Sequence, residues 1–240
     1  MKIVFAGPSL YGADYDAGDV VVRGPAQMGD VERAMADGAT AIGLIDGHYQ
    51  QVGAVWHKEI LLALSAGVAV YGAASMGALR AAECEAFGMV PVGSIARRYC
   101  SGALFDDADV ALTNGPAELG FPPLTEAMVD VAATLAHLAA LGLVTPSEAQ
   151  TVSAAARKTF FADRTVAAVF DRLDHPRAPA LRGLYDTHRV SQKTQDALEL
   201  LDLMKSLQPG AAAAPADWRF ANSPFWTGRV TPRSSSVTSL

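Results

Sequence analysis

A serine at an expected sharp turn is the residue of this sequence best placed for chemistry. Ser75 follows a short apolar run at residues 68–71 and three small residues, and it precedes good helix formers at residues 79–83. This order predicts a strand, a tight turn and a helix, so the Ser75 hydroxyl should project from the carboxyl end of a strand. The amides of Met76 and Gly77 would point out of the helix N-terminus, where they could hold an oxyanion or a substrate group.

The segment partly matches the nucleophile elbow of hydrolases, Gly-x-Ser-x-Gly, with Ala73 in place of the first glycine. A serine in that position can act as a nucleophile if a base removes its proton. The same position also suits a simple helix cap, because serine side chains accept hydrogen bonds from first-turn amides. The segment by itself leaves both roles open.

Three residues are candidate bases for Ser75. Lys58 is preferred, because it should lie in the first turn of the helix that precedes the Ser75 strand. A free lysine titrates near ~10.4, so burial and the helix N-terminus would have to lower its pKa strongly. Alternatively, Lys58 is exposed and paired with a neighbouring acid. His57 and Lys193, the latter in the first turn of the last expected helix, are the other candidates.

Two acidic residues could orient a base or a substrate amine. Asp46 follows the third expected strand, and Glu83 lies in the helix after Ser75. An aspartate before a glycine is also a common turn former, so Asp46 has a plain structural explanation as well.

Composition excludes several classes of protein. The chain has 240 residues, of which 50% are hydrophobic, and a formal charge of -6 without a basic run, so we expect no nucleic acid partner. We expect a cytoplasmic protein without a membrane segment, because no signal peptide or spanning helix is evident. Two cysteines and five histidines show no metal-binding spacing, and dinucleotide and P-loop motifs are absent, so we expect no metal and no cofactor.

Short apolar runs alternate with helical runs in the first part of the chain. Strands are expected at 2–6, 20–23, 41–45 and 68–71, and helices at 31–37, 56–66 and 94–100. The predicted fold class is therefore α/β, with a parallel sheet core, flanking helices and functional groups at the carboxyl ends of the strands.

Beyond residue 86 the pattern becomes helical. A strand-like run at 110–112 follows an acidic loop, and the Gly/Pro-rich segment 114–123 has apolar groups that could cover a pocket. The helical C-terminal part should contain four helices, capped in turn by Thr125, Thr145, Asp163 and Ser191.

The expected organisation is one domain and a tail. Residues 1–207 form the α/β domain with its helical C-terminal extension, and residues 208–240 form an Ala/Pro/Ser-rich, flexible tail. Four aromatic residues could pin part of the tail to an apolar surface: Trp218, Phe220, Phe225 and Trp226.

Several segments together resemble the core of the TfuA-like family. They are, in chain order, Ile45-Asp46-Gly47, Trp56-His57-Lys58-Glu59, Gly72-Ala73-Ala74-Ser75-Met76-Gly77-Ala78-Leu79-Arg80-Ala81-Ala82-Glu83, Phe87-Gly88-Met89, Gly115-Pro116-Ala117-Glu118 and Pro123-Leu124-Thr125-Glu126-Ala127-Met128. Gly7-Pro8-Ser9-Leu10 and residues 158–164 and 193–201 also fit, so the resemblance covers most of residues 2–205.

The resemblance implies a role in peptide thioamidation. Proteins of this family accompany YcaO enzymes, which use ATP to activate a backbone amide whose oxygen is replaced by sulfur in a precursor peptide. The implied activity is release of sulfide from a ThiS-like carrier protein with a C-terminal thiocarboxylate, through a Ser-Lys pair. The serine maps onto Ser75, and the lysine onto Lys58 with Lys193 as the alternative. A non-catalytic docking subunit that presents the peptide or the carrier to the YcaO enzyme is the other hypothesis, and a small-molecule serine hydrolase is a third.

Overall fold

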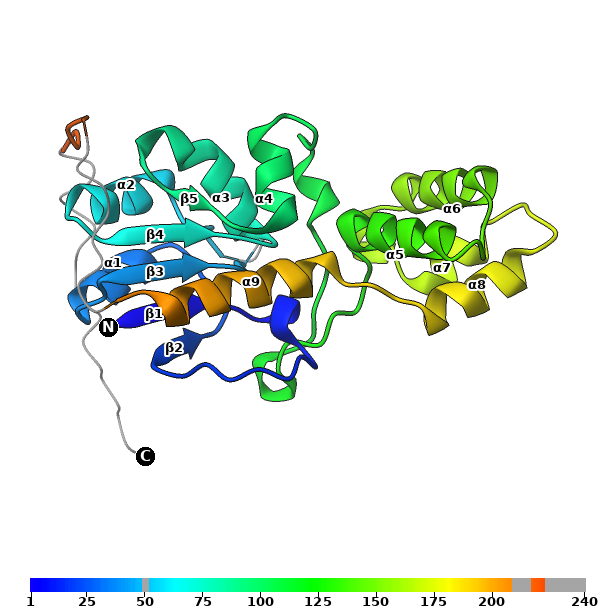
Figure 1. Cartoon of the computed structure of the whole chain (residues 1–240), viewed down its shortest axis with the longest axis horizontal. Coiled ribbons are helices and arrows are strands. Elements are labelled where there is room, and N and C mark those ends of the chain that lie inside the picture. The colour runs from blue at the N-terminus through cyan, green and yellow to red at the C-terminus, as the bar shows by residue number, and fades with distance from the viewer. Residues whose placement is uncertain (49–51, 209–216, 223–240) are drawn as a thin grey trace.

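A parallel β-sheet forms the centre of the computed structural model, which describes residues 1–48, 52–208 and 217–222 (Figure 1). Its strands are β1 (Lys2–Phe5), β2 (Val20–Arg23), β3 (Ala41–Leu44), β4 (Ala69–Gly72) and β5 (Val90–Pro91). They lie in the order β2-β1-β3-β4-β5, and each neighbouring pair is parallel. The chain extends from β1 toward both edges, which creates a topological switch point between β1 and β3.

The strands are apolar because the sheet is covered on both faces. All four residues of β3 are buried, and Ile3 and Val4 of β1 have no exposed surface. Gly43 of β3 permits a close approach of the covering helix: a Cβ atom there would lie 2.6 Å from Leu200. The expected α/β class with a parallel sheet is thus confirmed.

Helices cover the two faces unequally. One face packs against α1 (Asp30–Ala36), α2 (His57–Ser65) and α3 (Met76–Cys84). The opposite face packs against the long helix α9 (Gln192–Ser206), which runs alongside the strands in Figure 1. Helix α4 (Gly93–Cys100) contacts both α3 and α9 beside β5. Two distant parts of the sequence therefore build one α/β layer structure.

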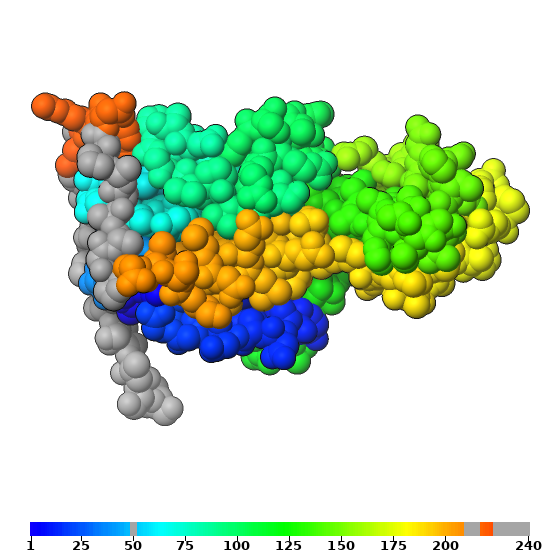
Figure 2. All heavy atoms as spheres, viewed as in Figure 1, coloured from blue at the N-terminus to red at the C-terminus, as the bar shows by residue number. Residues whose placement is uncertain are grey.

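A group of helices with its own apolar core, here called the helical lobe, lies beyond the carboxyl ends of the strands (Figures 1 and 2). It consists of α5 (Met128–Ala140), α6 (Pro146–Lys158), α7 (Val166–Phe170) and α8 (Ala178–Thr187). The chain then returns to the sheet through α9, so the first turn of α9 lies where the helical lobe meets the sheet. This confirms the expected helical C-terminal part.

Short 3-10 turns complete the fold. They are Pro8–Leu10, Glu85–Phe87, Asp107–Asp109, Ala117–Leu119 and Phe161–Asp163.

Local signals predicted several element ends correctly. The Thr145 side chain accepts from the Glu148 amide at 3.2 Å and Glu148 bonds back to the Thr145 amide at 2.8 Å, which confirms the capping box of α6. The Ser191 hydroxyl accepts from the Thr194 amide at 3.1 Å and caps α9 as predicted.

Other expectations in the helical part were wrong. Residues 110–112 form no strand, because they follow a 3-10 turn and the Val110 amide bonds to Asp107. Thr125 does not cap α5, since its hydroxyl accepts from the Thr113 amide at 2.8 Å instead. Thr165, rather than Asp163, caps α7. Helix α8 was not predicted, although the proline in its first turn is compatible with a helix start, because only two of its residues are buried and its apolar pattern is short.

Part of the tail lies against the α/β domain, as its aromatic residues predicted. The indole N–H of Trp218 donates to the Phe87 carbonyl oxygen at 3.1 Å, and the two rings meet edge to face. The ring of Phe220 lies 5.5 Å from the Lys58 ammonium. Phe225 and Trp226, which we expected to act in the same way, lie outside the described residues.

Candidate functional site

A cavity of about 470 Å³ lies at the carboxyl ends of β1, β3 and β4, and Phe161 of the helical lobe forms part of its lining. Segments from all parts of the fold line it: Pro8, 46–48, Ser75, 112–117, Phe121, Phe161 and Lys193. The cavity thus includes the switch point between β1 and β3, the place where open α/β sheets bind their ligands. Asp46, Ser75 and Lys193 of the predicted site residues lie together at this edge of the sheet.

Ser75 lies at the turn between β4 and α3. It stands at the N-cap position, but its side chain accepts no capping hydrogen bond. The residue is only 4% exposed, and within the described part of the chain its hydroxyl has no hydrogen-bond partner. A buried hydroxyl that lies on a cavity wall and makes no capping hydrogen bond is available to bind a ligand. The structure therefore removes the plain capping explanation for Ser75.

The backbone before Ser75 is strained, and its neighbours are tightly packed. Ala74 has a φ of 62°, a left-handed conformation that a residue with a Cβ atom rarely adopts. A Cβ atom on Gly77 would lie 1.8 Å from the Leu44 carbonyl oxygen, and one on Gly72 would lie 2.1 Å from the Gly77 carbonyl oxygen. The glycines let α3 begin directly against the ends of β3 and β4, which fixes the position of Ser75.

The expected oxyanion donors differ in availability. The Gly77 amide donates to the Ile45 carbonyl oxygen at 3.1 Å, so it is already used to fasten α3 to the end of β3. The Met76 amide is the first of α3, and within the described residues it makes no hydrogen bond. Of the two donors, only the Met76 amide can be offered to a ligand in this conformation.

Lys193 is buried on the same cavity wall. It is 1% exposed, and its ammonium donates to the Val110 carbonyl oxygen at 2.9 Å. No carboxylate of the described residues lies within ion-pair distance of it. Burial lowers the pKa of Lys193, while the charges of Asp46 and Asp130 act in the opposite direction. The structure thus places Ser75 and a buried lysine with a lowered pKa on the same cavity.

Asp46 organises the switch point. One of its oxygens accepts from the Gly7 amide at 2.8 Å and the Ser9 amide at 2.9 Å, and the other accepts from the Ser9 hydroxyl at 2.7 Å. These bonds tie the segment after β3 to the segment after β1. Asp46 is therefore more than a turn former, because it shapes the cavity wall from which it faces Lys193.

The other three predicted site residues lie elsewhere. Lys58 does not line the cavity, and its ammonium lies over the Phe220 ring. His57 and Glu83 are about half exposed and contact each other at 2.8 Å, and Glu83 also pairs with Arg80. They form a surface cluster between α2 and α3. The structure does not bring these residues to Ser75.

The Gly/Pro-rich segment 114–123 covers the cavity, as its composition predicted. The Gly115 amide donates to the Pro122 carbonyl oxygen at 2.8 Å and closes the segment into a loop. Phe121 has a φ of 60°, and its ring lies against Gly7 and Gly24. A bulky residue in that conformation is unusual, so surrounding contacts must hold it.

Sequence reasoning did not name two lining residues, His48 and Phe161, as site residues, and it included Asn114 and Phe121 only in the segment expected to cover a pocket. Ser9, which supports the site through Asp46, was also left out. The break Gly7-Pro8-Ser9-Leu10 after the first strand was the available signal for Ser9. Phe161 comes from the helical lobe, and nothing in its local sequence indicates that it reaches the cavity.

Fold and site together define an α/β protein with a buried serine and a buried lysine on one cavity at the carboxyl edge of a parallel sheet. Residues 46–165 match the family model described as TfuA-like protein, which is half of the 240 residues. The chain belongs to the TfuA-like family, and the predicted resemblance is confirmed. Family membership is consistent with an association with YcaO-dependent thioamidation. The matched residues include Ser75 and end before Lys193.

No curated protein matches the chain. Among the helices of the described residues, none combines the length and the apolar character that crossing a bilayer requires.

Proposed function

We propose that this chain is an accessory hydrolase of peptide thioamidation that releases sulfide from a thiocarboxylated, ThiS-like sulfur carrier. The sulfide would serve a YcaO enzyme that replaces a backbone amide oxygen of a precursor peptide. The observation that carries the proposal is the cavity that Ser75 and Lys193 share, since both side chains are almost completely buried there. Membership of the TfuA-like family supports the choice of pathway.

In the first step, Ser75 attacks the carbonyl carbon of the thiocarboxylate. Lys193, as the neutral amine, accepts the hydroxyl proton, and the Met76 amide stabilises the oxyanion. The carbon–sulfur bond then breaks, the proton passes to the departing sulfur, and hydrosulfide leaves. The product is an ester between Ser75 and the carrier.

In the second step, water attacks this ester with Lys193 again as the base. The bond to the Ser75 oxygen breaks, one proton of the water returns to Ser75 through Lys193, and the carrier leaves as a carboxylic acid that releases the other proton to solvent. No redox change occurs, and the only co-reactant is water.

The burial of the two lysines favours Lys193 over Lys58 as the base. A lysine acts as a base only after losing its proton, and burial without a paired carboxylate favours the neutral amine. Lys193 is almost completely buried and has no paired carboxylate among the described residues, whereas Lys58 is only partly buried and its ammonium lies over the Phe220 ring. We therefore assign the base to Lys193, the alternative that the sequence left open.

Sulfide release by the purified chain, from a carrier with a synthetic thiocarboxylate end, tests the proposal. We expect release without any YcaO enzyme. In Ser75→Ala we expect the rate of release to fall by about 10³-fold or more, because the nucleophilic hydroxyl is lost. The fold should be retained, because the substitution removes only that one oxygen atom. Undiminished release by a folded Ser75→Ala protein would exclude Ser75 as the nucleophile.

The same assay separates this proposal from a docking role. The cover of the cavity exposes an apolar side chain, Leu119, which is 65% exposed and would suit contact with a partner protein. A docking subunit would bind the YcaO enzyme through such residues but release no sulfide by itself. A wild-type protein that binds its partner and is inert toward the carrier would favour this second function.

A further inference from the structure

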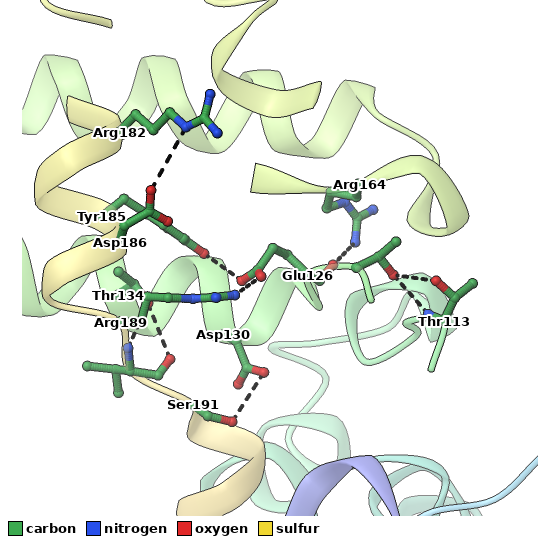
Figure 3. Close-up of polar contacts among 12 residues, drawn as sticks. Thr113, Glu126, Asp130, Thr134, Arg164, Arg182, Tyr185, Asp186, Arg189 and Ser191 are labelled. Carbon is green, nitrogen blue, oxygen red and sulfur yellow. Dashed lines mark hydrogen bonds and ion pairs between the residues drawn. The ribbon is translucent and has the colours of Figure 1, made fainter. Parts of the chain in front are cut away.

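The helical lobe holds the first turn of α9, the helix that carries Lys193. Asp130 of α5 points toward the start of α9 in Figure 3. One of its carboxylate oxygens accepts from the backbone amide of Lys193 at 3.0 Å, and the other accepts from the Ser191 hydroxyl at 3.4 Å. A carboxylate in this place satisfies a first-turn amide and opposes the positive end of the helix dipole.

A second residue of α5 fixes the chain just before α9. The Thr134 hydroxyl accepts from the Val190 amide at 3.0 Å and donates to the Val190 carbonyl oxygen at 3.2 Å. Thr134 lies one helical turn after Asp130, so one face of α5 holds both Val190 and the start of α9. The position of Lys193 in the cavity therefore depends on the helical lobe.

Capping alone does not account for an acid at position 130. Ser191 already caps α9 through the Thr194 amide, and burial raises the pKa of Asp130, so its negative charge is costly. A neutral acceptor such as Thr134 would fasten the backbone without this cost. What only the acid provides is a negative charge beside the buried ammonium of Lys193.

We propose that Asp130 is a positioning residue for Lys193, which couples the helical lobe to the cavity by fixing the first turn of α9 and by placing a charge near the lysine. The part of this inference that concerns catalysis by Lys193 rests on the proposed function. It makes the helical lobe part of the working site, although only Phe161 of that lobe lines the cavity.

Other groups also act on Lys193 and must be kept unchanged in a test. Asp46 and His48 lie on the cavity wall, and Val110 accepts the ammonium hydrogen bond. Asp196, one turn along α9, accepts from the Ile95 amide at 2.6 Å. Substitutions at position 130 leave all of these in place.

The titration of Lys193 can be measured without any assay of activity. The chain has five lysines, so carbon-13 labelling of the lysine ε-carbons gives few NMR signals, and Lys193→Met identifies the one required. We expect Asp130→Asn to keep an acceptor for the Lys193 amide and to lower the midpoint of the Lys193 titration by about one pH unit, because a negative charge is lost. Asp130→Ala should also increase hydrogen exchange at the first amides of α9.

Two variants serve as matched controls. Asp186→Asn makes the same chemical change on α8, where the acid lies near exposed Arg182, so the Lys193 titration should not move. Thr134→Val removes a neutral contact of the same helix face, so it should lower stability without moving the titration. An unchanged midpoint in Asp130→Asn, or an equal change in Asp186→Asn, would overturn the proposal. If Asp130→Ala does not fold, Asp130→Asn still decides.

The pH profile of sulfide release links the inference to function. In Asp130→Asn the rising limb should move to lower pH together with the NMR midpoint. A wild-type protein that releases no sulfide would sink the proposed function, yet the NMR titration would still test the role of Asp130. Conversely, active protein with an unmoved titration would sink only the role of Asp130.

Discussion

Two lysines occupy the same position in two helices and have different environments. Lys58 is the second residue of α2, and Lys193 is the second residue of α9. Lys58 is partly buried with its ammonium over the Phe220 ring, whereas Lys193 is buried on the wall of the Ser75 cavity. The helix position is identical, so the first turn of a helix does not by itself determine the environment of a lysine. Burial against distant segments makes the difference.

The acids of the two helices complete the comparison. In α2 the buried ionisable residue is Glu59, which accepts from the Gly29 amide at 2.8 Å and from the Trp56 amide at 3.3 Å. It fastens the start of α2 to the start of α1. The first turn of α2 thus buries an acid with a structural role, and the first turn of α9 buries a lysine that faces a cavity.

The largest expected effect separates the two lysines by activity. Lys193→Met should reduce sulfide release by about 10³-fold or more, whereas Lys58→Met should change it only a few-fold, because Lys58 does not line the cavity. The rate should rise with pH through the lowered pKa of Lys193, which lies below the ordinary lysine value of 10.5.

A double substitution sharpens this result. Members of one catalytic unit are not additive, so Ser75→Ala with Lys193→Met should be hardly worse than either single variant. The opposite pattern, with Lys58→Met inactive and Lys193→Met active, would show that Lys58 of α2 and not Lys193 is the base.

A smaller effect concerns Glu59 and the dependence of stability on pH. Burial raises the pKa of Glu59 from 4.5 to about 7 in the folded protein. Between these values the unfolded chain loses the proton first, so the free energy of unfolding should fall as the pH rises, by roughly 3 kcal/mol for this residue. Below pH 4.5 the contribution is fully present.

Urea unfolding at several pH values measures this contribution. Glu59→Gln has no proton to lose, so the difference in stability between it and the wild type should vary across this window and become constant above pH 7. A difference that does not change with pH would contradict the raised pKa of Glu59.

The smallest expected effect is the cost in stability of burying Lys193. The pKa of Lys193 is lowered on folding, so between the folded value and 10.5 the unfolded chain binds more protons and the folded state is disfavoured. Lys193→Met removes this cost and should raise the free energy of unfolding near pH 7 by about 1 kcal/mol, after subtracting the lost bond to Val110.

This gain should shrink as the pH approaches 10.5, because the amine of the unfolded chain also becomes neutral. Lys58→Met is the control, and its stability should stay within about 0.5 kcal/mol of the wild type. Equal effects of the two substitutions would mean that burying Lys193 lowers the free energy of unfolding no more than Lys58 does.

Signals that span only a few residues allowed much of the fold to be predicted. The apolar runs of the first four strands, the capping box at Thr145 and the cap at Ser191 all depend on neighbours within one turn or one strand. The strand, turn and helix around Ser75 belong to the same group. These interactions form inside the segment itself, so the amino-acid sequence by itself determined them.

The choice between the two lysines belonged to the tertiary structure. Lys193 is 118 residues after Ser75 in the sequence, and it is buried only because α9 returns across the sheet and the Val110 segment meets it. The same holds for Thr125, which bonds to Thr113 instead of capping a helix, and for the Gly77 amide, which the end of β3 occupies. Burial and hydrogen-bond competition depend on distant segments meeting in space, so they are decided only when the chain has folded.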